Sequence, residues 1–178
     1  MATVIEIPAL ATERLLLRAF RASDWEAFAA MEARPEVRRF RGGNVLTPAE
    51  AWTSMETHLG QWALRGYGIF ALEETASHRF VGFAGILHPA DWPEPEIAYT
   101  LDPAFWGRGF ATEAAWAARD WAFAQFGFER MASFIMPENT ASVRVAEALG
   151  AVREGTIALR GFVAEWWAHR RPGTGVVV

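Results

Sequence analysis

The chain has 178 residues, of which 52% are hydrophobic and 21% charged, and it contains no cysteine. This length suits one domain with a substantial core, and this balance is far from that of disordered chains. Without cysteine there can be no disulfide framework, no thiolate zinc site and no cysteine nucleophile. We therefore expect a single domain over residues 1–178, with its core at about residues 12–170.

All 17 basic residues are arginine, and the formal net charge is -4. The lack of lysine excludes a Schiff-base lysine and the lysine of a phosphate-binding P-loop. The negative charge gives no general attraction to nucleic acid or to an anionic membrane, so we expect neither as a partner. No apolar run approaches the roughly 20 residues that span a bilayer, and the first residues lack a signal-peptide pattern, which predicts a cytoplasmic protein.

The first predicted elements are a strand at residues 12–20 and a helix at residues 21–33, where Ser23 or Asp24 could be the N-cap. The arginine-rich residues 34–41 are expected to form a solvated helix end and loop, although they could contact an acidic partner.

A second helix is predicted at residues 46–63, because Thr47 suits the N-cap, Pro48 the first helical position and Glu50 the capping box. Three strands are then expected, at residues 67–74, 79–88 and 95–103.

The most regular helix is predicted at residues 109–126, where Phe110, Ala114, Ala117 and Trp121 share one face. A strand, a short helix and a final pair of strands follow, at residues 130–138, 139–150 and 151–171. This order of elements predicts an α/β fold with one mixed sheet covered by helices.

The stretch FWGRGFATEA, residues 105–114, removes side chains where a strand leads into a helix. Glycines at 107 and 109 would let an anion approach the free N–H groups of the helix start, and Arg108 and Thr112 could add hydrogen bonds. An ordinary turn that needs glycine for its dihedral angles is the alternative. A P-loop or a dinucleotide fingerprint would need a different pattern.

Several motifs in order resemble the GNAT superfamily of acyl-CoA-dependent N-acetyltransferases, and within it the RimJ/RimL-type branch. They are TERLLLR, IAYTLDPAFWGRGFATEA, PENTASVRVAEALGAVREG and EWWAHRR. The resemblance implies the acyl-CoA N-acyltransferase fold, a mostly antiparallel twisted sheet with flanking helices and a splay between the fourth and fifth strands. It also implies acetyl-CoA as cosubstrate, no metal, and an amine acceptor, either a protein N-terminus or a small amine.

The resemblance also assigns the contacts with the cosubstrate. The pyrophosphate motif Gln/Arg-x-x-Gly-x-Gly/Ala falls on Trp106, Gly109 and Ala111, with tryptophan at the first position as in the RimJ/RimL-type branch. The backbone of Leu101 would pair with the pantetheine arm as an added strand, and Asn139 would contact the same arm. The expected binding set is Leu101, Trp106, Gly107, Arg108, Gly109, Phe110, Ala111, Thr112 and Asn139.

Acetyl transfer to an amine needs a base, because only the neutral amine has a lone pair that can attack. Glu96 is the candidate base, and the alternative is a glutamate that faces solvent at a strand edge. Ser142 is the candidate acid by resemblance, with Tyr99 as a second candidate. Alternatively, Ser142 only bonds the backbone of its helix.

The histidines show no metal-ligand spacing, so we expect no metal site. His58 and His78 are expected at the surface, whereas His88 could line the substrate side. Among the tryptophans, Trp116 and Trp121 are expected to pack on the sheet. Trp52 and Trp62 could form an acceptor wall or pack in the core, and the segment EWWAHRR could support a homodimer.

The sequence thus predicts an acetyl-CoA-dependent N-acetyltransferase that works by direct attack in a ternary complex. Two other classes of protein remain open. One is a non-catalytic acyl-CoA-binding sensor, and the other is a protein that binds ATP through the same glycines, which the lack of lysine disfavours.

Overall fold

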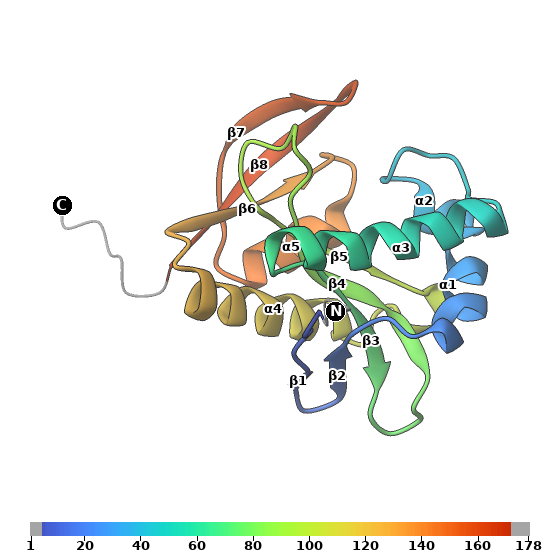
Figure 1. The fold of residues 1–178 in the computed structure, drawn as a ribbon. Coiled ribbons are helices and arrows are strands. Elements are labelled where there is room, and N and C mark those ends of the chain that lie inside the picture. Colours follow the sequence, from blue (N-terminus) through green and yellow to red (C-terminus); the bar gives the residue numbers. More distant parts are fainter. Residues whose placement is uncertain (1–4, 172–178) are drawn as a thin grey trace.

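A computed structural model describes residues 5–171 as an open sheet of eight strands with helices on both faces (Figure 1). The strands are β1 (Leu10–Ala11), β2 (Leu15–Arg18), β3 (Ile69–Glu74), β4 (Phe80–Leu87), β5 (Glu96–Leu101), β6 (Arg130–Ile135), β7 (Val152–Leu159) and β8 (Phe162–Arg170). The α-helices are α1 (Trp25–Glu32), α2 (Pro35–Arg38), α3 (Pro48–Arg65), α4 (Phe110–Phe126) and α5 (Thr140–Ala148). Two 3-10 turns, η1 (Ala22–Asp24) and η2 (Pro103–Phe105), precede α1 and α4. The ends of the predicted domain, residues 1–4 and 172–178, lie outside the described residues.

The sheet has the strand order β1-β2-β3-β4-β5-β6-β8-β7. Neighbouring strands are antiparallel throughout, except that β5 and β6 are parallel. The mixed, mostly antiparallel sheet expected from the sequence is confirmed.

The sheet opens between β5 and β6. On one side, β5 pairs with β4 in a continuous ladder, in which Glu96 lies opposite Leu87 at one end and Leu101 lies opposite Gly82 at the other. On the other side, β5 and β6 share a single residue pair, Glu96 with Ala132. Beyond that pair the two strands diverge, which confirms the predicted splay between the fourth and fifth of the expected strands.

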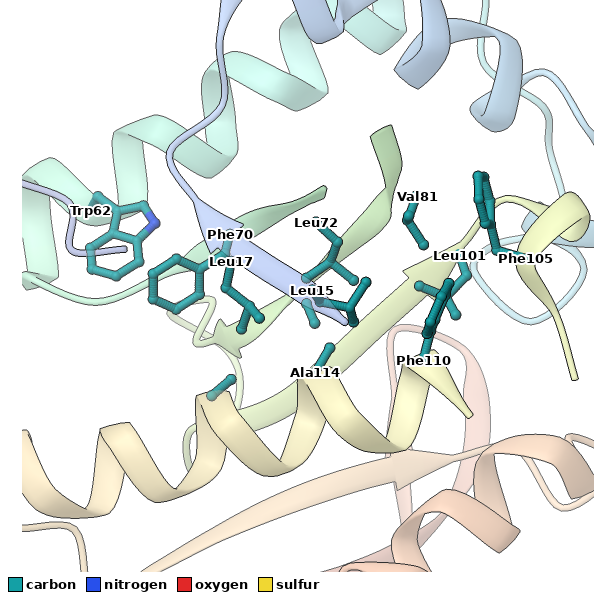
Figure 2. Close-up of a cluster of buried hydrophobic side chains, with 12 residues drawn as sticks. Leu15, Leu17, Trp62, Phe70, Leu72, Val81, Leu101, Phe105, Phe110 and Ala114 are labelled. Carbon is teal, nitrogen blue, oxygen red and sulfur yellow. The ribbon is translucent and has the colours of Figure 1, made fainter. Parts of the chain in front are cut away.

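Opposite faces of the sheet carry different helices (Figure 1). Side chains alternate along a strand, so Ile69 of β3 faces α1 and α3, whereas Phe70 faces α4. Figure 2 shows the α4 side, where Ala114 lies below Leu15 and Phe110 lies beside Leu101 and Phe105. The sheet is therefore the middle layer, with α1 and α3 on one face and α4 on the other.

Helix α3 begins as predicted. The Thr47 hydroxyl accepts a hydrogen bond from the Glu50 backbone N–H, and the Glu50 carboxylate accepts one from the Thr47 N–H at 2.8 Å. The helix ends at Gly66, which has a left-handed φ of 74°.

Two expectations about position are wrong. The strand predicted at residues 12–20 is only the four-residue β2, because Thr12 bonds the backbone of Leu15 in a turn that separates this strand from β1. Trp116 does not pack on the sheet: it lies on the outer face of α4, is 45% exposed and stacks against Arg119. Core packing, one of the two positions expected for Trp52 and Trp62, is confirmed for Trp62, whereas Trp52 is exposed, so the two do not form one wall.

The arginine-rich segment is also less solvated than expected. It forms α2 and a turn, and both Arg38 and Arg41 bind the carboxylate of Glu32, at 3.0 and 2.6 Å. Glu32 has no exposed surface, so these two ion pairs anchor the turn to α1.

Candidate active site

A cleft of about 730 Å³ lies at the splay and reaches both faces of the sheet. On β5 it is lined by Ala98 and Thr100, which face α1 and α3, and by Ile97 and Tyr99, which face the opposite side. The remaining lining residues come from the turn at 38–43, α3, β3, β4, the loop between β4 and β5, β6 with the segment that follows it, α5 and the hairpin between β7 and β8. Two molecules could therefore meet in the gap from opposite faces.

Glu96 lies in this cleft, where its carboxylate bridges the opening of the sheet. One oxygen accepts a hydrogen bond from Trp92 Nε1 at 2.7 Å, and the other accepts one from the backbone N–H of Phe134 at 3.3 Å. Burial raises the pKa of Glu96 to about 7, against the opposing effect of these two donors. A carboxylate with this pKa is partly protonated at neutral pH and can exchange a proton there.

Tyr99 and Ser142 meet on the opposite side of the cleft. The Tyr99 hydroxyl donates to the backbone carbonyl of Ser142 at 3.1 Å, and both residues line the cleft. Burial raises the pKa of Tyr99, so its hydroxyl keeps its proton at neutral pH. The structure thus brings Tyr99 and Ser142 together across the opening from Glu96.

Asn139 is the N-cap of α5, and its side-chain oxygen accepts from the Ser142 N–H at 3.3 Å. The same residue lines the cleft. Its position fixes the start of α5 beside the splay.

The glycine stretch lies where α4 begins, on the face opposite α1 and α3. Gly107 and Gly109 have left-handed φ values of 72° and 79°, and Gly109 is the N-cap. The first bond of the helix runs from Glu113 N–H to Gly109 O, so the N–H groups of the three residues before Glu113 have no partner within the helix. Free N–H groups with the positive end of the helix dipole form a suitable anion site.

The start of α4 is held in place by contacts with the chain near β1 and β2. The Glu113 carboxylate accepts hydrogen bonds from the Thr12 hydroxyl at 2.6 Å and from the Arg14 backbone at 2.8 Å. Arg14 in turn donates to the carbonyl of Arg108 at 2.9 Å. The glycine turn is therefore positioned before any ligand binds.

The side chain of Arg108 points to Glu74, with which it forms an ion pair, and its guanidinium lies over the ring of Phe110. Binding an anion with this side chain would compete with the Glu74 pair, so the backbone N–H groups are the better placed donors. Ala111 and Thr112, in the same first turn, are partly exposed.

Leu101 ends β5 where the splay is open. The Asp102 N–H donates a hydrogen bond to the Val81 carbonyl, on the β4 side. The backbone groups of successive residues point to opposite sides of a strand, so the N–H and C=O groups of Leu101 and Tyr99 point away from β4 and toward the gap. The Leu101 carbonyl accepts from Trp106 Nε1 at 2.9 Å, while the Trp106 side chain is half exposed. Trp106 thus connects the glycine turn to the end of β5.

A buried pair, Ser133 and His169, supports the other edge of the gap. The Ser133 hydroxyl donates to the Ile97 carbonyl at 3.1 Å and lies 3.0 Å from His169 Nε2. With its hydrogen donated to Ile97, the hydroxyl must accept from His169, which places the imidazole proton on Nε2. Burial lowers the pKa of His169 to about 4, so the ring is neutral.

The structure corrects one expectation about the histidines and does not support another. His58 is not a surface residue: it packs against the rings of Phe20 and Phe83 and lines the cleft, and burial lowers its pKa to about 3. His88 is not among the cleft-lining residues and instead bonds the Tyr67 hydroxyl at 2.7 Å. His78 is exposed, as expected.

Sequence patterns did not point to Trp92, Ser133 or Arg160, and they indicated the arginines at 34–41 only as a possible contact for an acidic partner. Their positions depend on strands and turns that are distant in the chain, and only the fold brings them together. Within residues 5–171, no three histidine, aspartate or glutamate side chains gather as metal ligands would. In the same range, no helix is both long enough and apolar enough to cross a bilayer.

Residues 14–152 match the family described as "Acetyltransferase (GNAT) domain". The chain belongs to the GNAT family of acetyltransferases. It is 27% identical over 150 residues to the uncharacterized N-acetyltransferase p20 of Bacillus licheniformis, an alignment that covers 83% of this chain and 84% of that protein. An acetyltransferase of Agrobacterium tumefaciens superposes with a TM-score of 0.84 at 30% identity, over 96% of this chain and 99% of that one.

The GNAT fold of this chain is also similar to that of RimL, the ribosomal L7/L12 α-N-protein acetyltransferase, solved in complex with coenzyme A. The TM-score is 0.75 at 18% identity, over 92% of this chain and 98% of RimL. The predicted resemblance to GNAT enzymes is confirmed, and the chain is an N-acetyltransferase.

Proposed function

We propose that this GNAT enzyme transfers an acetyl group from acetyl-CoA to a primary amine by direct attack in a ternary complex. The observation that carries the proposal is the cleft at the splay, which is open to both faces of the sheet and holds a carboxylate between them. The similarity in fold to RimL with coenzyme A supports acetyl-CoA as the cosubstrate.

In this proposal acetyl-CoA lies on the α4 side. The N–H groups at the start of α4, behind Gly107 and Gly109, would hold the pyrophosphate. The backbone groups of Tyr99 and Leu101 that point into the gap would pair with the pantetheine arm, and Asn139 would contact the same arm. This arrangement places the thioester between Glu96 and Ser142.

The amine would enter from the side of α1 and α3. Glu96, held by Trp92 and by Phe134 N–H, would take a proton from the ammonium group, directly or through one water molecule. The hydroxyl of Ser142 or Tyr99 would then give a proton to the departing thiolate. Most of the acceleration would come from holding the two substrates in the gap.

The proposal is tested by measuring release of the coenzyme A thiol, and the mass of the product, over a panel of N-terminal peptides and small amines. We expect release with at least one amine, and loss of about 100-fold or more in kcat for Glu96→Gln with acetyl-CoA affinity unchanged. Tyr99→Phe and Ser142→Ala should also lower kcat and not acetyl-CoA binding.

Glu56→Gln is the matched control, because Glu56 accepts from Trp52 Nε1 at 2.7 Å on the exposed face of α3 and lies outside the cleft. Acetyl-CoA binding without release on any amine would favour a sensor and contradict the proposal. A protein that binds ATP in place of acetyl-CoA would contradict it as well.

The cytoplasmic location and the homodimer remain predictions from the sequence. The segment EWWAHRR, which suggested a dimer, lies in β8, between β6 and β7. The outer strand at this end of the sheet is β7, so an edge pairing would involve β7 and not β8.

A further inference from the structure

Arginine dominates the charge of the cleft. Of the residues that line it, the ones that can carry a charge at neutral pH are Glu96 and four arginines: Arg38, Arg39, Arg41 and Arg160. The only histidine in the lining, His58, is neutral at that pH because burial lowers its pKa to about 3. The lining thus has an excess of positive charge, although the whole chain has a net charge of -4.

These arginines lie on the side assigned to the amine. The Arg41 guanidinium is 4.9 Å from the ring centre of Phe83, which faces α1 and α3. The Arg160 guanidinium is 4.6 Å from the ring of Trp92, whose indole binds Glu96. The glycine turn at the start of α4 is on the opposite face, so this positive charge serves a different ligand from the pyrophosphate.

Existing ion pairs cancel only part of this charge. Arg38 and Arg41 share the single carboxylate of Glu32, which leaves one positive charge from the three groups. Burial lowers the pKa of Arg41, but a guanidinium keeps its proton at neutral pH.

Arg160 is neutralised by Asp91, at 2.6 Å. Arg39 has no carboxylate within ion-pairing distance among residues 5–171, and its guanidinium lies 5.0 Å from the ring centre of Phe40. Together with the charge left over near Glu32, Arg39 gives the turn at 38–43 an excess of two positive charges, and Glu96 is the one carboxylate in the lining of the cleft.

The turn that carries these charges is held in a fixed conformation. Arg41 N–H and Gly43 N–H both bond the Arg38 carbonyl, at 2.8 and 3.0 Å, and Arg38 Nε donates to the Asn44 carbonyl at 2.8 Å. Gly42 and Gly43 adopt left-handed φ values that close the turn. The positive groups are therefore positioned by the fold before an acceptor arrives.

We infer that the acceptor carries a carboxylate close to its amine, and that Arg39 and its neighbours in the turn at 38–43 bind this carboxylate while the amine reaches Glu96. The inference rests on the proposed function, since it names the substrate class of the same cleft. The aromatic rings of Phe83, Phe134 and Phe162 would surround an apolar part of the acceptor. A polyamine fits poorly, because its additional ammonium groups would face arginine.

The carboxylate could belong to a free amino acid with an apolar side chain or to an acidic residue near the start of a peptide. Two matched pairs distinguish these sources: phenylalanine against phenylalanine amide, and a peptide with aspartate at its second and third positions against the same peptide with lysine there. The amide has the less basic amine, so it would be the better acceptor if the carboxylate had no effect. Spermidine serves as the polycationic probe.

Acetyl-CoA binding is measured first by calorimetry, and thiol release is then measured for each acceptor. We expect kcat/KM to be about tenfold or more higher for the anionic member of at least one pair, the size of a hydrogen bond to a charged group. Arg39→Gln should remove most of this preference by raising KM, with kcat nearly unchanged. Arg65→Gln, which removes the same charge from an exposed residue of α3 outside the cleft lining, should keep the preference.

Equal kcat/KM within each pair, or a preference for the lysine peptide or spermidine, would overturn the inference and leave the proposed function standing. A preference that persists in Arg39→Gln at wild-type KM would also overturn it. Failure to bind acetyl-CoA, or no release on any amine, would instead reject the proposed function, and this inference with it.

Discussion

Two glutamates show how the surroundings of a residue decide its chemistry. In both Glu56 and Glu96, the carboxylate accepts from a tryptophan indole four residues earlier in the chain, at 2.7 Å. The pair at Glu56 lies on the exposed face of α3 and has an ordinary structural role. The pair at Glu96 lies in the cleft, where burial raises the pKa to about 7. The same contact therefore belongs to a candidate general base only at Glu96, where the carboxylate is buried.

The pKa of Glu96 predicts how stability depends on pH. Because burial raises this pKa from 4.5 to about 7, the folded state binds more protons than the unfolded state in that interval. Wild-type stability should therefore fall, relative to Glu96→Gln, as the pH rises from 5 to 8. We expect the difference in the free energy of unfolding between the two proteins to change by about 2 kcal/mol over this range. This figure is reduced to allow for the part of Glu96 that remains exposed.

Urea denaturation of both proteins at pH 5 and pH 8 measures this change. Glu56→Gln retains Glu96, so its stability should also fall relative to Glu96→Gln over this range. If the difference in the free energy of unfolding between wild type and Glu96→Gln is the same at pH 5 and pH 8, the fold does not raise the pKa of Glu96.

At the scale of elements, local signals were sufficient at the starts of α3 and α4. The capping box of Thr47 and Glu50 is present as expected, and α4 starts directly after the glycine turn. The splay could be anticipated only through the resemblance to GNAT enzymes, because it follows from β5 and β6 pairing only at Glu96 and Ala132. These residues are distant in the sequence.

Helical spacing did not decide which side of a helix is buried. Trp116 has a spacing compatible with the core but lies on the outer face of α4, and His58, expected at the surface of α3, packs against Phe20 and Phe83. The choice depends on the apolar residues that the strands present, which local sequence does not contain. For the same reason, Glu32 could not be foreseen as the shared partner of two arginines.

The capping box makes a prediction about α3. Thr47→Ala removes the side-chain oxygen that accepts from Glu50 N–H, and should lower the free energy of unfolding by about 1 kcal/mol. Thermal denaturation measures this loss. Thr53→Ala is the control, because Thr53 bonds a backbone carbonyl inside the same helix and should change stability much less. Equal effects of the two substitutions would show that the cap contributes nothing beyond helix propensity.

At the scale of the whole molecule, the open sheet separates two binding regions and joins them at one point. The start of α4 offers backbone N–H groups on one face, while the arginine-rich turn and aromatic rings lie on the other. The cleft at the splay connects the two faces. The proposed function depends on the first region, because it places the pyrophosphate of acetyl-CoA at the glycine turn.

The most direct test of this claim is calorimetric titration of acetyl-CoA into wild type, Gly109→Glu and Gly127→Glu. The two glycines lie at opposite ends of α4 with left-handed φ values of 79° and 64°, so glutamate strains the backbone similarly at both. Only at position 109 does it place a negative charge in the proposed anion site. We predict that Gly127→Glu binds within about threefold of wild type and that Gly109→Glu loses binding. Equal binding by all three proteins would contradict the account.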